Sequence, residues 1–401
     1  MNERSSIGLR VALTTLAMTL LVTSTYAATE KVLHSFNNDG TDGFEPISGL
    51  TFDASGNLYG TTIRGGDSSD GTVFKLTPQG NGSWSETVLF NFNGTAGELP
   101  YAGVIFDGSV NLYGTTCGGG FYDYGTVFEL SPKAGGRWAE KVLHSFSNKD
   151  GACSYAGLIF DSFGNLYGTV YGGGPGGGGA VFELMPTAGG KWTEKIVHAF
   201  NLDEYGGGYP EGGVIFDAEG NLYGATGDNN AGVVFELSPK TGGGWTEKVL
   251  RHFDVKDGAD PHSSPIFDAA GDLYDTTYVG GPHGDGTVFE LIPMTGGGWT
   301  EKLLYSFNGN DGDYCYAGVV FDSVGNLYGT MVEGGTYNNG TVFELMPKAG
   351  GGWMGKTLHD FKDKDGIEPW AGLILDAAGN LYGTTQGGGE YGYGTVFEIT
   401  P

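Results

Sequence analysis

The chain has 401 residues, of which 77 are glycine and 13% are aromatic, and its formal net charge is −27. Such a negative charge excludes the basic footprint that nucleic-acid binding requires. Glycine-rich chains are often disordered, but the aromatic residues here recur at fixed places in a repeated unit, which disordered sequences do not show.

Residues 1–27 have the three parts of a secretory signal peptide. Arg4 and Arg10 supply positive charge, residues 11–22 form a short apolar stretch, and Thr25-Tyr26-Ala27 resembles a cleavage site. The apolar stretch is too short for a membrane-spanning helix, and no later hydrophobic segment follows it. We therefore expect a secreted or periplasmic protein without a membrane anchor, in which residues 28–401 form a single domain.

One unit recurs seven times. It reads G-L-I-F-D-x-x-G-N-L-Y-G-T-T-x-x-G-G, then G-T-V-F-E-L-x-P, then G-G-x-W-T-E-K-V-L-H-S-F. Its N-L-Y tripeptide begins at Asn57, Asn111, Asn165, Asn221, Asp272, Asn326 and Asn380, with spacings of 54, 54, 56, 51, 54 and 54 residues. A period this regular indicates a repeat architecture. Residues common to all copies are interpreted as scaffold, so function is sought where the copies differ.

Each unit contains four short runs with the composition of β-strands. In the third copy they span residues 156–161, 165–170, 179–184 and 192–200 and are bounded by Gly, Asp, Asn and Pro. No segment shows a sustained helical period. Four antiparallel strands repeated seven times predict an all-β, seven-bladed β-propeller. Leucine-rich, TPR and HEAT units are shorter or helical and do not fit.

The two ends of the sequence predict how the ring closes. The last unit stops at Pro401, before its fourth strand, whereas residues 29–36 match the fourth strand of other units, such as residues 245–253. We therefore expect the N-terminal strand to complete blade 7, which removes exposed sheet edges. The repeated tryptophans that open the fourth strands are expected to pack one blade against the next.

Two kinds of loop share one face of a propeller: those from strand four to the next strand one, and those from strand two to strand three. We call this face the top face. The residue that precedes the innermost strand of each blade should lie on it. In chain order these residues, called the entry ring below, are Ile47, Tyr101, Tyr155, Glu211, His262, Tyr316 and Trp370. Aromatic faces with polar handles suit a glycan or another amphipathic ligand. The alternative is that these side chains plug the channel or pack between blades.

The top loops also carry acidic turns, with Asp39, Asp42, Asp150, Asp257, Asp260, Asp311, Asp313, Asp363 and Asp365. Oxygen-rich clusters suit calcium, but Asp-Gly is equally ordinary turn chemistry. No motif for another cofactor, P-loop, zinc-binding helix or nucleophile elbow is present.

The fifth unit departs most from the pattern, since Asp275 replaces the glycine that follows N-L-Y in the other copies. Candidate acid, base or metal-binding residues, expected in the top loops of this blade, are Asp260, His262, Asp275, His283 and Asp285. Drift between repeats explains the same departures without function. The other histidines lie in fourth strands, where Phe90 and Tyr305 take the same place, and are interpreted as packing residues.

Of the three cysteines, Cys117 and Cys153 are expected on the top face of neighbouring blades. A disulfide between them is compatible with export, and its geometry decides whether it forms. Cys315 would then be free. None of the three has a patterned histidine partner that would indicate a catalytic thiol.

The units G-N-L-Y-G-T-T-x-x-G-G and G-T-V-F-E-L-x-P closely resemble the repeat of bacterial proteins described as choice-of-anchor tandem repeat GloVer-containing, over residues 33–401. This resemblance implies an exported repeat protein and no established catalytic residues. Members often carry a C-terminal anchor, and no such segment precedes Pro401. The D-x-x-G-N-L-Y hairpin is also similar to that of NHL and gluconolactonase-like propellers.

These observations lead us to expect a secreted binding or interaction module for a glycan or another extracellular ligand. One alternative is a lactonase- or lyase-like propeller enzyme that uses the acids and histidines of blade 5. Another is a structural protein of the cell envelope. The sequence fixes neither the ligand nor the oligomeric state.

Overall fold

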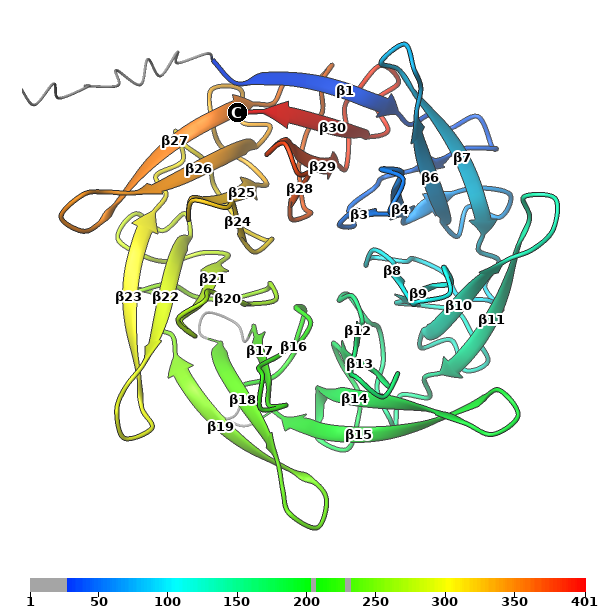
Figure 1. Cartoon of the computed structure of the whole chain (residues 1–401), viewed down its shortest axis with the longest axis horizontal. Coiled ribbons are helices and arrows are strands. Elements are labelled where there is room, and N and C mark those ends of the chain that lie inside the picture. The colour runs from blue at the N-terminus through cyan, green and yellow to red at the C-terminus, as the bar shows by residue number, and fades with distance from the viewer. Residues whose placement is uncertain (1–26, 203–206, 228–231) are drawn as a thin grey trace, which may run out of the picture.

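A computed structural model describes residues 27–202, 207–227 and 232–401 of the chain. The expected signal peptide, apart from Ala27, lies outside the described residues. The described residues form seven four-stranded antiparallel sheets arranged around a central axis (Figure 1). This confirms the predicted seven-bladed β-propeller. The described part of the chain contains no helix with the length and apolarity that a membrane crossing needs.

Each blade contains four strands, numbered outward from the central axis. The innermost are β3 (Thr51–Phe52), β8 (Ile105–Phe106), β12 (Ile159–Phe160), β16 (Ile215–Phe216), β20 (Ile266–Phe267), β24 (Val320–Phe321) and β28 (Ile374–Leu375). The second are β4 (Leu58–Thr62), β9 (Leu112–Thr116), β13 (Leu166–Val170), β17 (Leu222–Thr226), β21 (Leu273–Thr277), β25 (Leu327–Met331) and β29 (Leu381–Thr385).

The outer half of each blade is longer. The third strands are β6 (Thr72–Pro78), β10 (Thr126–Pro132), β14 (Gly177–Thr187), β18 (Val233–Pro239), β22 (Thr287–Pro293), β26 (Thr341–Pro347) and β30 (Thr395–Thr400). The fourth are β7 (Trp84–Asn91), β11 (Trp138–Ser145), β15 (Lys191–Asn201), β19 (Trp245–His252), β23 (Trp299–Ser306), β27 (Trp353–Asp360) and β1 (Thr29–Ser35). β2 (Gly43–Phe44) and β5 (Arg64–Gly65) pair to form an additional two-stranded ribbon.

The innermost strands are shorter than the sequence predicts. In blade 3 the expected strand 156–161 is reduced to β12, two residues long. An innermost strand has a hydrogen-bonded neighbour on one side only. The residues before it are free to bond to the adjacent blade instead, as described below for the candidate site.

The N-terminal strand closes the ring as expected. β1 pairs antiparallel with β30, so the blue and red ends of the chain lie side by side in Figure 1. The pairing shifts between Val32 and His34, and the β10–β11 pairing contains the same irregularity, where Val142 and His144 oppose consecutive residues. β1 therefore reproduces the register of an ordinary fourth strand, bulge included.

The core lies between the blades rather than within one layer. A phenylalanine at or just after the end of each fourth strand packs against a phenylalanine of the next blade's third strand; Phe36 and Phe74, for example, have ring centroids 5.1 Å apart. Tryptophans from the start of the fourth strands contact the preceding blade, as Trp192 does with Tyr113. Burying one such side chain contributes about 1.5–3 kcal/mol, so every blade is stabilised by its neighbours.

The glycine of the L-Y-G-T-T motif is required by this packing. At Gly60 a Cβ atom would lie 2.6 Å from Cζ of Phe74, and the glycines at the same position of the other second strands meet their phenylalanines in the same way. Blade 5 is the exception, because Asp275 occupies the position opposite Phe289. The prediction that Asp275 lies in a top loop is wrong, because Asp275 lies in the middle of β21 and is fully buried.

Candidate functional site

The entry ring is held in place by hydrogen bonds between blades. Threonines of the second strands donate to the carbonyl oxygen of the residue that follows each ring residue in the next blade. Thr330 Oγ1, for instance, lies 2.9 Å from the oxygen of Ala371, directly after Trp370. The bond recurs in every blade except the fourth, where Ala225 replaces the threonine. The ring residues thus stand on a rigid scaffold.

The backbone before each ring residue is left-handed. The residue two positions earlier has a φ between 54° and 64° in all seven blades: Glu45, Leu99, Cys153, Tyr209, Asp260, Tyr314 and Glu368. This conformation is uncommon outside glycine, and such strain persists only where the surroundings impose it. Backbone hydrogen bonds supply that restraint. The amide of Gln386, for example, donates to the oxygen of Glu368 at 3.0 Å.

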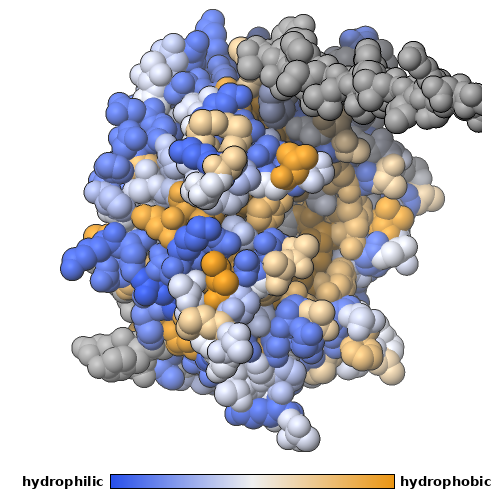
Figure 2. Space-filling model, turned by 60° about the vertical axis from the view of Figure 1, so that its left-hand side comes forward, coloured by the Kyte–Doolittle hydropathy of each residue, from blue (hydrophilic) through white to orange (hydrophobic). Residues whose placement is uncertain are grey.

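The seven ring residues line one cavity of about 570 Å³ at the channel mouth. Each side chain is partly exposed. A volume of this size lies within the usual range for small-molecule sites. In Figure 2 the visible surface is largely hydrophilic, and hydrophobic residues gather in a hollow. The structure therefore brings the seven entry-ring residues together around one cavity, and the role of six of them, all except Ile47, in ligand binding stays a prediction.

Glu211 is the polar centre of the ring. Its Oε2 accepts hydrogen bonds from the Tyr316 hydroxyl at 2.5 Å and is 2.9 Å from His262 Nδ1. Tyr316 belongs to blade 6 and Glu211 to blade 4, so the tyrosine reaches past blade 5. Burial alone would raise the pKa of Glu211, but the hydrogen bonds with His262 and Tyr316 and the electrostatic effect of His262 outweigh it and hold this pKa below its usual value. A carboxylate is thereby fixed at the cavity wall.

Aromatic rings flank this carboxylate. Tyr101 and Tyr155 have centroids 4.7 Å apart, and Tyr316 and Trp370 are 4.9 Å apart. Burial, together with Tyr101 and Glu211, raises the pKa of Tyr155 to about 12, so its hydroxyl remains a hydrogen-bond donor. The ring side chains contact one another, as the packing alternative required, yet they leave an open cavity between apolar faces and polar groups.

Two site residues were missed because they do not belong to the entry ring itself. Gln386 lines the cavity, and its Oε1 accepts a hydrogen bond from Trp370 Nε1 at 2.7 Å. Tyr278 stacks on His262 with centroids 5.0 Å apart. Both residues directly follow the T-T pair of their unit. The sequence did contain a sign of their role, because the residue at this position differs from copy to copy within an otherwise regular motif.

The blade 5 candidates do not assemble as one acid–base site. His262 faces Glu211, whereas His283 is exposed in the loop between β21 and β22. Asp275 accepts hydrogen bonds from the Ser263 hydroxyl and the Thr276 amide. Its Oδ2 is buried and has no hydrogen-bond partner among the described residues. Burial raises the pKa of Asp275 to about 7, with the hydrogen bonds opposing that shift.

The acidic turns lie in separate blades and largely cap their own loops. Asp39, for example, accepts from the Thr41 amide, and Asp311 accepts from the Asn308 amide. Within the described ranges, three potential metal ligands come together in two places, and each includes one of these aspartates, Asp150 or Asp365.

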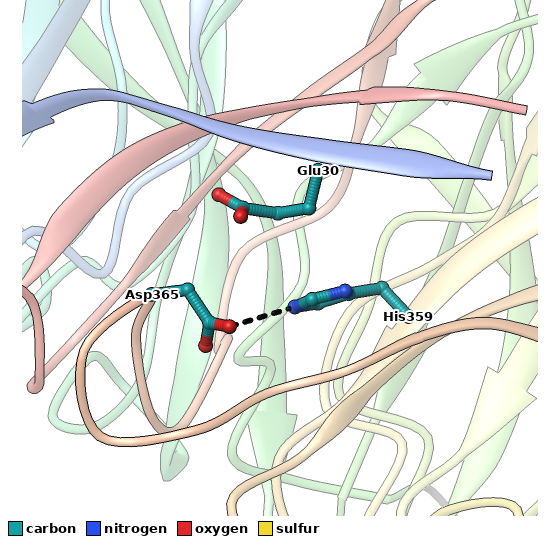
Figure 3. Close-up of side chains that lie close together, drawn as sticks. All are labelled: Glu30, His359 and Asp365. Atoms are coloured by element: carbon teal, nitrogen blue, oxygen red, sulfur yellow. Dashed lines mark ion pairs between the residues drawn. The ribbon is translucent and has the colours of Figure 1, made fainter.

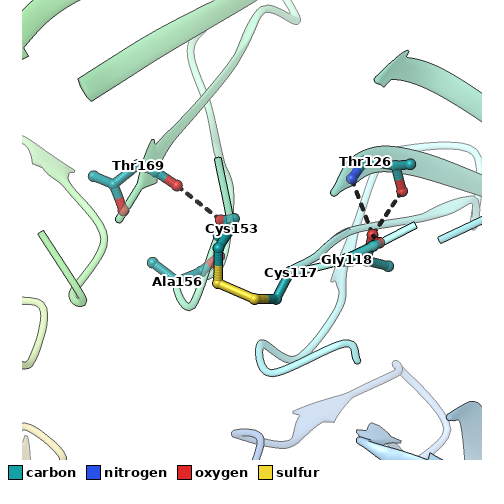
Figure 4. Close-up of a disulfide and its surroundings, with 8 residues drawn as sticks. Cys117, Gly118, Thr126, Cys153, Ala156 and Thr169 are labelled. Carbon is teal, nitrogen blue, oxygen red and sulfur yellow. Dashed lines mark hydrogen bonds between the residues drawn. A yellow bond between two sulfur atoms is a disulfide. The ribbon is translucent and has the colours of Figure 1, made fainter. Parts of the chain in front are cut away.

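A disulfide joins Cys117 to Cys153, and so links the top loops of blades 2 and 3 (Figure 4). Cys153 is also the left-handed residue of its blade's entry segment. Cys315 is free and buried, and burial raises the pKa of its thiol to about 12. A thiol in this state is a poor nucleophile.

Among solved structures the chain is similar to a protein from Lactobacillus plantarum, with a TM-score of 0.50, 14% identity and coverage of 77% of this chain and 83% of the other. It is also similar to a PQQ-bound aldose sugar dehydrogenase from Streptomyces coelicolor, with a TM-score of 0.41, 12% identity and coverage of 93% and 98%. A luciferin-regenerating enzyme matches with a TM-score of 0.45, 11% identity and coverage of 93% and 95%. The first likeness shows a shared fold alone.

No curated protein matches the sequence. A family model described as the Gloeobacter/Verrucomicrobia repeat matches residues 18–231 and again residues 225–401. The two matches together span the seven blades, as expected for a model of a tandem unit. The chain belongs to the Gloeobacter/Verrucomicrobia repeat family.

Proposed function

We propose that this protein is an exported binding module that takes a glycan, or a similar amphipathic ligand, into the cavity of the entry ring. The observation that carries the proposal is the convergence of all seven variable ring positions on that one cavity. Scaffold positions hardly change from blade to blade, whereas these do. Ring positions that served packing alone would be expected to repeat like the rest.

The chemistry of the cavity suits a sugar. Apolar C–H faces of a pyranose can stack on the Trp370 and tyrosine rings, while hydroxyl groups can bond to polar groups at the ring edge. Glu211 has a second oxygen beyond the one that His262 and Tyr316 bind. Because that carboxylate and the net charge of −27 are negative, neutral or cationic glycans should bind better than acidic ones.

Exposed aromatic residues extend the surface beyond the cavity. Phe121, Tyr122, Tyr337 and Tyr391 lie in the top loops between second and third strands, and Phe121 is 84% exposed. Large exposed apolar side chains on a face with a cavity favour an interaction surface. A polymer seated in the cavity would pass over these loops.

Export is part of the proposal and accounts for the disulfide. The bond between Cys117 and Cys153 would persist in an oxidising compartment outside the cytosol. N-terminal sequencing of protein recovered from the periplasm or medium of an expressing bacterium tests this part. We expect a chain that begins at Ala28.

Screening the purified chain on a broad polysaccharide array, with calcium and with chelator, tests the binding function. We expect selective binding to neutral glycans, at least tenfold weaker in Trp370→Ala and in Tyr101→Ala. Loss of binding in chelator would add calcium to the site. Phe163→Ala is the matched control, because Phe163 is 86% exposed in the hairpin loop of the opposite face. Absence of binding in every condition would contradict the proposal and favour a structural role in the envelope.

A second candidate function is acid–base catalysis in the same cavity. The Glu211–His262 pair, with atoms 2.9 Å apart, favours it, because a paired carboxylate and imidazole can exchange protons with a substrate. Incubating the bound glycans and a panel of sugar lactones with the protein, and with Glu211→Gln, separates the two functions. New products that disappear in Glu211→Gln would indicate an enzyme, whereas recovery of the intact ligand would indicate binding alone.

A further inference from the structure

Histidine–carboxylate clusters occur on the outer side of the ring, away from the entry-ring cavity. One contains His359 of β27, Asp365 of the following turn and Glu30 of β1 in the next blade. The ligand atoms that these side chains offer all lie within 4.8 Å of one another. Histidines at this repeat position were predicted to be packing residues. His359 does contact Phe361, but packing does not account for the two carboxylates.

The first cluster combines an ion pair with a carboxylate from the next blade. His359 Nε2 lies 3.5 Å from Asp365 Oδ2, and the Glu30 side chain approaches from the neighbouring strand (Figure 3). Among the described residues, both His359 Nε2 and Glu30 Oε1 are buried without a hydrogen-bond partner. Buried polar atoms are nearly always paired, and the unpaired Glu30 Oε1 is therefore free to contact a further group beside the His359–Asp365 ion pair.

The second cluster repeats the arrangement between blades 2 and 3. His144 Nε2 lies 3.1 Å from Asp150 Oδ2, and Glu194 of β15 completes the group. Asp150 Oδ1 accepts hydrogen bonds from the amide and hydroxyl of Ser147, which orient the carboxylate. Glu194 Oε1 is buried and lacks a partner in the part of the chain that the structure describes. The same three repeat positions therefore supply both clusters.

Blades 4 and 5 show what these positions bind when the histidine is replaced. Arg251 occupies the histidine position, and its Nη2 forms ion pairs with both Asp257 and Glu301, the second at 2.6 Å. The positively charged guanidinium of Arg251 thus lies between the two carboxylates. In the histidine clusters the carboxylates converge in the same way without a guanidinium between them.

Blades 5 and 6 lose the cluster altogether. Gly355 replaces the glutamate and Tyr305 the histidine, and a Cβ atom at Gly355 would lie 2.6 Å from Tyr305 Cζ. The aromatic ring fills the space of the glutamate side chain. At this junction both the histidine and the glutamate are replaced, so the ligand set of the two clusters is missing here.

We propose that the His359–Asp365–Glu30 and His144–Asp150–Glu194 clusters each bind a divalent transition-metal cation of the zinc type. One imidazole nitrogen with two carboxylate oxygens suits zinc or manganese better than calcium, which prefers oxygen ligands alone. Ligands of a tetrahedral zinc ion lie about 3.3–3.6 Å apart. Side-chain movements of about 1 Å would bring the three ligand atoms of each cluster, which now lie within 4.8 Å of one another, to that spacing. Each ion would bridge two neighbouring blades.

Zinc titration of the untagged chain by calorimetry, after treatment with chelator, tests the proposal. We expect two ions per chain, a higher melting temperature with zinc, and no comparable effect of calcium or magnesium. His144→Phe and His359→Phe introduce the residue that blade 1 has at this position, Phe90, and each should remove one ion. Glu194→Gln and Glu30→Gln provide a second pair of variants that preserves side-chain shape.

Two further variants make the test specific. Glu140→Gln is the matched control, because Glu140 lies at the blade 1–blade 2 junction, where Phe90 replaces the histidine, and it should leave two ions bound. Arg251→His should add a third ion, held with Asp257 and Glu301, and an unchanged count of two would contradict the ligand assignment. Absence of zinc binding by the wild-type chain, or two ions retained in the variant with both histidines replaced, would overturn the proposal.

Discussion

At the residue scale, positions that depart from the repeat carry most of the chemistry. Asp275 replaces a glycine that the other blades need for packing, and its carboxyl group is fully buried. Burial raises its pKa from 3.8 to about 7. The hydrogen bonds from Ser263 and Thr276 oppose this shift most, followed by the electrostatic effect of His262. A neutral carboxyl group is thus the form that the fold accommodates.

This raised pKa predicts a pH-dependent stability. Between about pH 4 and 7 the folded protein keeps a proton on Asp275 that the unfolded chain has lost, so stability falls as pH rises. The slope approaches about 1.4 kcal/mol per pH unit. Asp275→Asn should remove this contribution, so its free energy of unfolding should improve relative to the wild type from pH 4 to pH 7.

Urea unfolding at several pH values measures the difference. Other buried carboxyl groups, such as Glu86, whose pKa burial and Asp42 raise to about 8, titrate in both proteins and cancel in the comparison. Glu219→Gln, at an exposed hairpin position, serves as the control and should run parallel to the wild type. Parallel curves for Asp275→Asn would show that Asp275 does not hold the extra proton.

At the element scale, each fourth strand stabilises the blade that follows it. β1 has the register, the bulge and the terminal phenylalanine of the other fourth strands, although it comes from the opposite end of the chain. Without it, β30 would present an unpaired edge of the kind that promotes aggregation. Closure therefore depends on one seven-residue strand.

Two phenylalanine variants test this closure. Phe36 and Phe92 are both 0% exposed and make matching contacts at different blade junctions. If β1 is an ordinary fourth strand, Phe36→Ala and Phe92→Ala should each cost about 3–5 kcal/mol. A large cost for Phe92→Ala with little for Phe36→Ala, measured by denaturant unfolding, would show that the ring does not close through β1.

At the scale of the whole molecule, the disulfide constrains the unfolded chain. It connects residues that are 36 apart in the sequence. In the chain-entropy description a loop of this size contributes up to about 4 kcal/mol. Reductant should therefore lower the urea midpoint of the wild-type chain. The variant with Cys117→Ser and Cys153→Ser should have the lower midpoint under both conditions. An insensitive wild type would contradict a stabilising disulfide.

The whole fold was predictable because seven copies of one pattern specify it, including the closing strand. The ring residues were also predictable, since each precedes an innermost strand at a fixed distance. Contacts between residues on different sides of the ring could not be predicted. Tyr316 reaches Glu211 past an intervening blade, and this depends on the angle between blades rather than on spacing. The outer clusters were missed for the same reason, although the unusual pairing of Tyr305 with Gly355 was visible in aligned copies.

The most direct test of the account is a calorimetric titration of the wild-type chain, and of Trp370→Ala, with the glycan that an array selects. If the ligand binds in the entry-ring cavity, we expect one site per chain, with an affinity that is weakened at least tenfold by Trp370→Ala and little changed by Phe163→Ala. Equal affinity in all three proteins would place the ligand elsewhere and contradict a binding site in the entry-ring cavity.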